Sequence, residues 1–163
     1  MCNRVALRGE KMITVTIYGL DQYIVGRLSK DLTVSLAKVY EVDEDEINFI
    51  APNAMYFHMG VEQTSWNVRV VVNAPKKVTV LQDLSRKAIL NTLRDSGVAI
   101  NISIEYYYFS QDDYYEDFDK EYPRYIREDN VVDFEEEEEE EYREEGEGED
   151  EIYTGNIFKD FSK

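Results

Sequence analysis

Residues 12–19 read MITVTIYG, and residues 66–73 read WNVRVVVN. In both stretches apolar and polar side chains alternate and β-branched residues are frequent, a pattern typical of strands with one buried face. Residues 47–51 (INFIA) and residues 99–109 (AINISIEYYYF) have the same character. The sequence therefore predicts four strands.

Two amphipathic helices are expected between these strands. After the first strand, apolar residues recur at spacings of three and four, as on the buried stripe of a helix. They are Ile24, Leu28, Leu32, Leu36 and Val39. A second stripe follows the third strand, at Leu81, Leu84, Ala88 and Leu93. Asp21 is placed to cap the first helix. The predicted order is β-α-β followed by β-α-β.

Each β-α-β unit is expected to be a right-handed crossover between parallel strands. Two such units predict an α+β fold with a four-stranded mixed sheet and both helices on one face. The side chains predicted to face the helices are all apolar: Ile13, Val15, Ile17, Ile47, Phe49, Trp66, Val68, Val70, Val72, Ile100, Ile102 and Ile104. The side chains predicted to face away are mostly small and polar: Thr14, Thr16, Asn48, Asn67, Arg69, Asn73, Asn101, Ser103 and Glu105.

The polar side of the sheet admits two interpretations. One is a sheet with one face open to water, which is common for antiparallel strands. The other is a wet interface between subunits, where water can satisfy small uncharged polar groups. Faces open to water often carry Lys and Glu, and this one carries few charges. The composition therefore favours the interface, and with it a homo-oligomer.

The charge of −17 is confined to the end of the chain. Residues 1–110 hold 12 Lys and Arg against 12 Asp and Glu, whereas residues 111–163 hold 6 against 23. We expect a domain at residues 12–127, in which the aromatic residues beyond position 110 pack back on the domain or on a neighbour. Residues 128–163 are expected to form a disordered acidic tail, either solubilising or docking on a protein partner.

The composition also excludes several classes of protein. No apolar stretch approaches the roughly 20 residues of a membrane span, so we expect no membrane contact. No Lys-rich stripe suggests a nucleic-acid surface, and a single cysteine rules out a disulfide scaffold. Residues 1–11 lack the apolar stretch of a signal peptide, which favours a cytoplasmic protein. Residues 1–11 have two interpretations. They form a short N-terminal arm, or they are not translated and the protein starts at Met12. The second interpretation is based on residues 8–11 (RGEK), whose codons can form a ribosome-binding site just before a start codon at Met12.

The predicted architecture resembles the tautomerase superfamily, which includes macrophage migration inhibitory factor. The resemblance covers about residues 12–118, and within the superfamily the chain is most similar to a bacterial family of uncharacterised proteins. Three stretches carry the match: MITVTIYGL, INFIAPNAMYFHMG followed by WNVRVVVN, and FSQDDYYEDF. The resemblance implies a homotrimer whose sheets surround a central channel.

The resemblance also implies a catalytic base that this sequence lacks. Superfamily enzymes use an amino-terminal proline as the base, because an α-amine titrates near neutral pH. Here Met12 is followed by Ile13, and the first proline in the chain is Pro52. We therefore expect no proline-dependent tautomerase activity.

Four residues are candidates for other chemistry: Met12, Arg69, Glu105 and His58. Arg69 and Glu105, on the polar sheet face, could hold an anionic ligand and a proton, or could form an ion pair. His58 is the only imidazole, and it is either a proton shuttle or a surface residue.

Candidate ligand-binding residues are Arg69 together with Tyr106, Tyr114 and Tyr115, although tyrosines also suit half-buried strands. No phosphate-binding, nucleophile-elbow or metal-binding motif is found, so we expect no cofactor and no metal. The leading hypothesis is a ligand- or partner-binding homotrimer. The alternatives are an enzyme that acts on a small carbonyl acid with another base, and a monomeric ferredoxin-like domain.

Overall fold

The computed structural model describes residues 12–117, 119 and 121–127. The extension 1–11 and the acidic tail 128–163, both expected from the sequence, lie outside the described residues. The chain divides into two units, Met1–Ile126 and Arg127–Lys163. All the helices and strands named below belong to the first unit.

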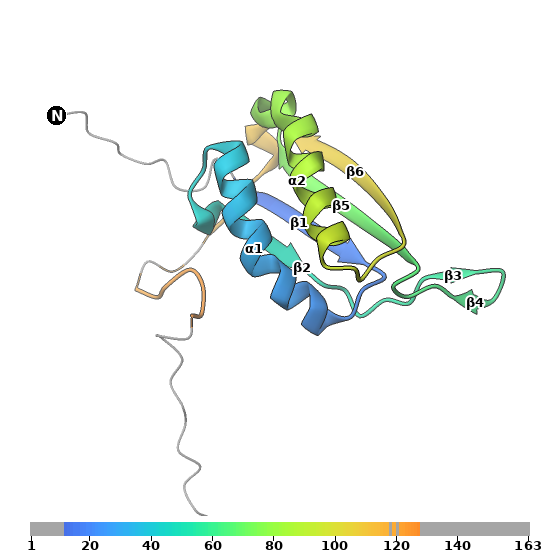
Figure 1. The fold of residues 1–163 in the computed structure, drawn as a ribbon. Helices are drawn as coiled ribbons and strands as arrows, with labels where there is room; N and C mark the ends of the chain where they lie inside the picture. Colours follow the sequence, from blue (N-terminus) through green and yellow to red (C-terminus); the bar gives the residue numbers. More distant parts are fainter. Residues whose placement is uncertain (1–11, 118, 120, 128–163) are drawn as a thin grey trace, which may run out of the picture. The chain divides into compact units, whose positions relative to one another are not determined.

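A four-stranded mixed sheet with the strand order β2-β1-β5-β6 forms the centre of this unit (Figure 1). Strands β1 (Ile13–Tyr18) and β2 (Ile47–Ile50) are parallel, as are β5 (Asn67–Pro75) and β6 (Asn101–Phe109). The two pairs meet where β1 and β5 run antiparallel. This is the predicted arrangement of two β-α-β units, and the predicted α+β fold class is confirmed.

Helix α1 (Gln22–Tyr40) begins and ends at identifiable capping residues. The side chain of Asp21 accepts a hydrogen bond from the Tyr23 amide at 2.8 Å, which satisfies one free N–H of the first turn. At the other end Glu41 adopts a left-handed conformation and its amide donates to the Ala37 carbonyl. The buried stripe contains the predicted Leu28, Leu32 and Leu36 and extends to Val25, Ala37 and Tyr40.

Helix α2 (Gln82–Asp95) follows directly on the 3-10 helix η2 (Lys76–Leu81). Its buried residues are Ser85, Ile89 and Leu93. Leu84, predicted to face the core, is exposed, because the buried stripe passes through the neighbouring Ser85. The apolar pattern cannot decide whether Leu84 or Ser85 faces the core, because adjacent residues lie only about 100° apart around a helix.

Both helices pack on one face of the sheet, which we call the covered face (Figure 1). Its central side chains are fully or almost fully buried and form one core with the helix stripes. These sheet residues are Ile13, Val15, Ile17, Ile47, Val68, Val70, Val72 and Ala74. The opposite side, the open face, carries the predicted polar set, so the predicted assignment of the two faces is correct for these positions.

Two residues predicted for the covered face lie outside the strands. Trp66 is exposed because residues 63–66 form a tight turn, in which the Trp66 amide donates to the Gln63 carbonyl at 2.9 Å. Ile100 is also exposed, and its amide donates to the Ser65 carbonyl at 3.3 Å. Strands β5 and β6 therefore begin one or two residues later than predicted.

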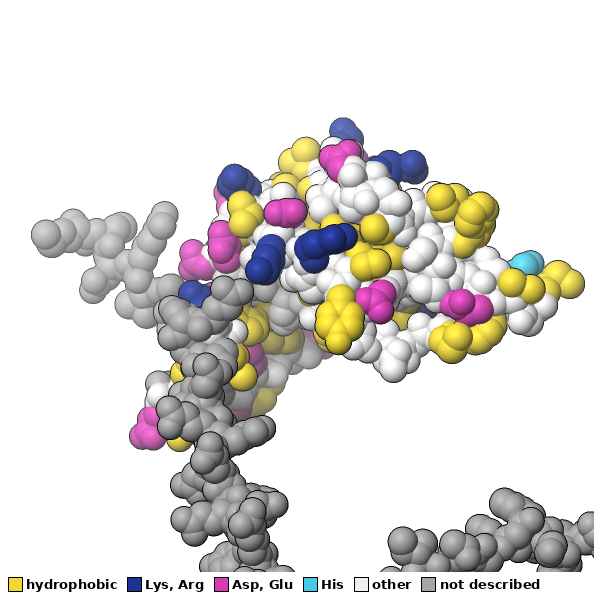
Figure 2. All heavy atoms as spheres, turned by 60° about the horizontal axis from the view of Figure 1, so that its bottom comes forward, with side chains coloured by type: hydrophobic (Ala, Val, Ile, Leu, Met, Phe, Trp, Pro, Cys, Tyr) yellow, Lys and Arg dark blue, Asp and Glu magenta, His cyan; other side chains and the backbone are white. Residues whose placement is uncertain are grey.

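The connection between β2 and β5 contains a small hairpin that the sequence did not predict. Strands β3 (Phe57–His58) and β4 (Val61–Glu62) pair around Met59 and Gly60, both with positive φ. Every residue of the two strands is exposed. Figure 2 shows hydrophobic side chains gathered on this projecting hairpin. Within the described residues, no helix is both long and apolar enough to cross a membrane.

Candidate functional site

The structure distributes the four candidate catalytic residues over three places. Met12 precedes β1, at one end of the sheet, and His58 lies on the exposed hairpin that extends from the other end. Arg69 and Glu105 lie together on the open face. Arg69 pairs with Tyr18 at the far end of β1, about 20 Å from Met12 at the rise of a strand. These four residues therefore do not form one site.

Arg69 and Glu105 are joined by a two-pronged ion pair across β5 and β6. The Nε and Nη2 atoms of Arg69 donate to Oε1 and Oε2 of Glu105 at 2.7 and 2.8 Å. The hydroxyl of Tyr107 donates to Glu105 Oε2 at 3.0 Å, and the guanidinium lies 5.9 Å from the ring centre of Tyr18. We call these four residues the open-face cluster.

The register of the sheet produces this cluster. Arg69 is opposite Ser103, and Glu105 is two residues further along the same strand, so the ion pair is a diagonal cross-strand contact. All four members belong to the open face because side chains alternate along a strand. Hydrogen bonds to Arg69 and then to Tyr107 hold the pKa of Glu105 below its usual range. The hydrogen bond to Glu105 raises the pKa of Arg69.

The cluster can still bind an additional acceptor. A guanidinium has five N–H groups, and the ion pair uses two of them, which leaves three, among them both Nη1 hydrogens, for another oxygen. The side chains of Arg69 and Glu105 are only about half covered, with 44% and 37% of their surface exposed. Such an arrangement suits a small carboxylate or another planar anion. A flat sheet face has no walls, so an enclosed site here requires a second surface above it.

Tyr106 occupies a different environment from Arg69, although both were candidates for one ligand site. It lies on the covered face, where its hydroxyl is 2.8 Å from Ser85 Oγ. Tyr108 stacks on it and donates to Oε1 of Gln82 at 3.0 Å. Burial raises the pKa of both tyrosines.

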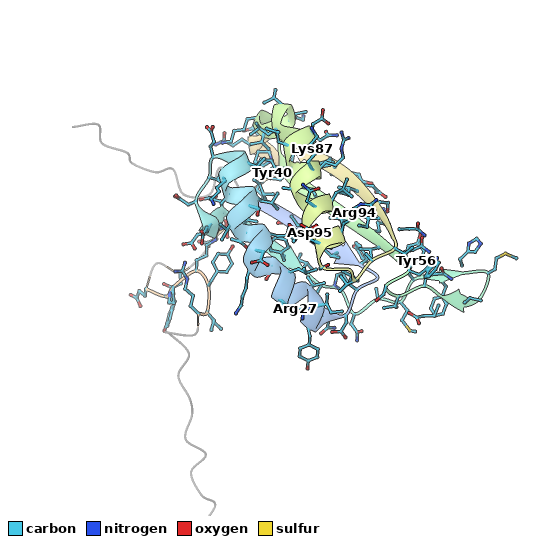
Figure 3. The ribbon with its side chains drawn as sticks, in the orientation of Figure 1. Arg27, Tyr40, Tyr56, Lys87, Arg94 and Asp95 are labelled. Carbon is cyan, nitrogen blue, oxygen red and sulfur yellow. The ribbon has the colours of Figure 1, made fainter. Side chains whose placement is uncertain are left out.

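Sequence analysis missed Tyr40 and Ser85 as members of this group. Tyr40 lies at the end of α1 beside the start of α2 (Figure 3), and burial raises its pKa above the ordinary value of 10. Tyr40 is four residues after Leu36, so the helical period could have placed it in the core. No local pattern predicts a fully buried serine at position 85. The group links both helices to β6.

The remaining candidates lie near the start of β1 or beyond β6. Met12 is only 3% exposed, and Nδ2 of Asn48 lies 3.0 Å from its Sδ. Tyr114 is partly buried and stacks on Phe109, whereas Tyr115 is exposed. Among the described residues, no three His, Cys, Asp or Glu side chains are grouped so as to hold a metal ion.

Comparison with solved structures shows which fold this is. A protein of unknown function from Vibrio cholerae is 18% identical, with 71% of this chain and 93% of that chain covered and a TM-score of 0.59. A domain of unknown function (DUF1904) from Sebaldella termitidis is 19% identical, with 65% and 96% covered and a TM-score of 0.58. A macrophage migration inhibitory factor-like protein from Entamoeba histolytica is 11% identical, with 66% and 96% covered and a TM-score of 0.52.

These likenesses confirm that the chain has the tautomerase fold expected from the sequence. No protein-family model matches the sequence, and no curated protein matches it. At identities below 20% the structural likeness establishes the fold alone, so function has to be argued from the site.

Proposed function

We propose that this tautomerase-fold chain is a homotrimer that binds a small anionic ligand at the open-face cluster and does not catalyse a proline-dependent reaction. The observation that supports this most directly is the cluster itself. An arginine with three N–H groups outside its ion pair is held in place by Glu105 and Tyr18, on a face whose side chains are mostly polar. A neighbouring copy would supply the second surface that an enclosed site needs.

The exposed hairpin supports assembly of several copies. Two-stranded hairpins are marginally stable alone in water, and this one buries none of its four strand residues. Large exposed apolar side chains lie along it and next to it: Met55, Tyr56, Phe57, Met59, Val61 and Trp66. Apolar patches of this kind are typical of protein interfaces.

The absence of a proline at the start of β1 supports binding over catalysis. The residue there is Met12, and its side chain is packed away from solvent. Neither Arg69 nor Glu105 replaces the missing base well, because each stabilises the charged form of the other. A carboxylate with a lowered pKa is a weak proton acceptor at neutral pH.

Light scattering during size-exclusion chromatography tests the assembly. We expect three times the chain mass of 19.2 kDa. Ser103→Lys, which adds a charge to the exposed part of the open face, should shift the protein toward single chains. Val80→Lys, a matched charge on the 3-10 helix η2, should leave the mass unchanged. A wild-type protein that remains a single chain would contradict the trimer and favour the monomeric ferredoxin-like alternative.

Calorimetric titration with small mono- and dicarboxylates tests the binding site. Arg69→Gln should abolish binding while the protein stays folded, and Lys87→Gln on the outside of α2 should not affect it. Adding an enolisable keto acid such as phenylenolpyruvate should give no efficient turnover. Efficient turnover would instead identify the chain as an enzyme with another base.

A further inference from the structure

The hairpin formed by β3 and β4 is firmly held at its base, although its strands bury nothing. The Gln63 amide donates to the Tyr56 carbonyl at 2.7 Å, which extends the pairing one step beyond the two strands. Oε1 of Gln63 accepts from Nδ2 of Asn67, at the start of β5, at 2.9 Å. The Ser65 amide donates to the carbonyl of Gly19, which follows β1, at 2.8 Å. The base of the hairpin is therefore fixed to the sheet from which it projects (Figure 1).

The turn of the hairpin carries an apolar side chain where the backbone disfavours one. Met59 and Gly60 have φ angles of 48° and 79°, the pattern of a two-residue type I′ turn. Asn, Asp and Gly usually occupy the first position of such a turn, because the left-handed conformation is strained for most other residues. Met59 is also 91% exposed. Neither turn formation nor burial in its own chain explains a methionine at this position.

The surface of the hairpin is uncharged and large enough to contribute to an interface. Residues 55–61 (MYFHMGV) contain no Asp, Glu, Lys or Arg. Its exposed apolar side chains include three aromatic ones, each of which buries about 150–250 Å² when fully covered. Together with the two methionines and Val61 they offer several hundred Å², the order of one partner's share, about 800 Å², of a standard interface.

The open face carries an uncharged row of side chains that suits this surface. Ile50 on β2 is opposite Thr16 on β1, and Thr16 is opposite Val71 on β5. We call these three residues the uncharged row. Ile50 is half exposed and Val71 is partly exposed. Because Val71 is in turn opposite Glu105, the row ends at the open-face cluster.

We propose that the hairpin of one copy docks on the open face of a second copy, with its Met59 on the uncharged row beside the open-face cluster. Each chain has one hairpin and one open face, so the contact is heterologous and can close into a ring in which every hairpin is used. The hairpin of the neighbouring copy is then the second surface that a site at Arg69 needs. This inference rests on the proposed assembly of several copies, and it adds which element makes the contact.

Replacing Met59 by asparagine separates docking from a local role in the turn. Met59→Asn creates the Asn-Gly pair that type I′ turns prefer, so the single chain should keep its circular dichroism spectrum and its thermal stability. Light scattering over a dilution series measures the assembly. The concentration of half-dissociation should rise at least about tenfold, because the burial of one methionine side chain is worth at least that factor. Val80→Asn, the same amide on the exposed η2, should leave this concentration unchanged.

Cysteine cross-linking tests the docked position itself. The single native cysteine, Cys2, is first replaced by serine. In that background, chains with Met59→Cys are co-expressed with longer, tagged chains that carry Val71→Cys. Mild oxidation should join the unlike chains, which the tag distinguishes on a non-reducing gel. Met59→Cys paired with Leu84→Cys, which is exposed on α2, should give no such product.

The outcomes distinguish this inference from the proposed function. If the wild-type protein is a trimer, either unchanged dissociation of Met59→Asn or a missing cross-link to Val71→Cys overturns hairpin docking and leaves the trimer standing. A wild-type protein that stays a single chain overturns both. If the cross-link forms but carboxylates do not bind, hairpin docking is supported and only the ligand proposal is wrong.

Discussion

The covered and open faces of the sheet are built from alternate residues of the same strands, yet their side chains differ strongly in solvent exposure. On β5, Val70 is completely buried against the helices, while its neighbour Val71 faces the open side and is partly exposed. On β6, the hydroxyl of Tyr106 is hydrogen-bonded to the buried Ser85, while that of Tyr107 donates to the partly exposed Glu105.

This difference indicates what each face contributes. Apolar burial on the covered face provides most of the folding free energy, since each fully buried aliphatic side chain is worth about 1.5–3 kcal/mol. The open face places polar groups where a second molecule can reach them. Changes to the covered face should therefore affect stability, and changes to the open face should affect binding and assembly.

Replacing adjacent valines tests this contrast most strongly. Val70→Asn places an amide among apolar side chains and should lower the free energy of unfolding by about 3 kcal/mol. Val71→Asn adds the same amide to the open face and should cost less than about 1 kcal/mol. Urea unfolding at one protein concentration measures both values. Equal losses would mean that both faces are buried to the same extent.

Replacing Gly19, which follows β1, tests how closely the backbones of the two β-α-β units must approach each other. It has a positive φ of 82°, and a Cβ there would lie 2.4 Å from the carbonyl oxygen of Asn67, at the start of β5. Gly19→Ala should destabilise the fold by about 2 kcal/mol. Gly26→Ala, in the interior of α1 with no atoms within 4 Å of the added Cβ, should stabilise it by about 0.5–1 kcal/mol. Thermal unfolding of the two variants should shift in opposite directions.

Adjacent tyrosines on β6 should give a smaller contrast. Tyr106→Phe removes one of the two hydrogen-bond partners of the buried Ser85 hydroxyl and should cost about 1 kcal/mol. Tyr107→Phe removes a bond to an exposed carboxylate and should change stability by less than about 0.5 kcal/mol. Denaturant titration can resolve the difference. A larger loss for Tyr107→Phe than for Tyr106→Phe would contradict the assignment of Tyr106 to the more deeply buried hydrogen bond.

The smallest expected effect is the pH dependence of the open-face ion pair. The pKa of Glu105 is lower in the folded chain than its ordinary value of 4.5. The stabilisation by this carboxylate is therefore present above about pH 4.5, and it is lost as the pH falls through the lowered value. The stability difference between wild type and Glu105→Gln should shrink in that acidic range. If this stability difference instead grows as the pH falls, the pKa of Glu105 is not lowered by folding.

The sequence predicted the fold well because the relevant signals are local. A period of two assigned Val15 and Val70 to one face and Thr14 and Arg69 to the other, and a period of about four identified the Leu28–Leu36 stripe. Trp66 was misassigned because it closes the tight turn of residues 63–66, and Ile100 because β6 begins only at Asn101. Leu84 was misassigned because the apolar pattern did not reveal the buried Ser85.

The candidate site was predicted only in part. Sequence analysis named Arg69 and Glu105 and allowed an ion pair between them, and the pair is formed. The alternation that placed Glu105 on the open face also places Tyr107 there and Tyr106 on the opposite face, but it was not extended to these tyrosines. The contact of Arg69 with Tyr18 could not be predicted, because it depends on the register between β1 and β5. The hairpin was missed since its strands are only two residues long and bury nothing.

The order of polar and apolar side chains along the chain determined the strands, the helices and the two faces, because backbone geometry converts sequence spacing directly into direction. Only the tertiary structure decided that Arg69 pairs with Glu105 and that the buried Met12 meets Asn48. Those contacts join residues far apart in sequence. Which residues meet depends on how whole strands and helices pack together, and a local sequence pattern does not encode that packing.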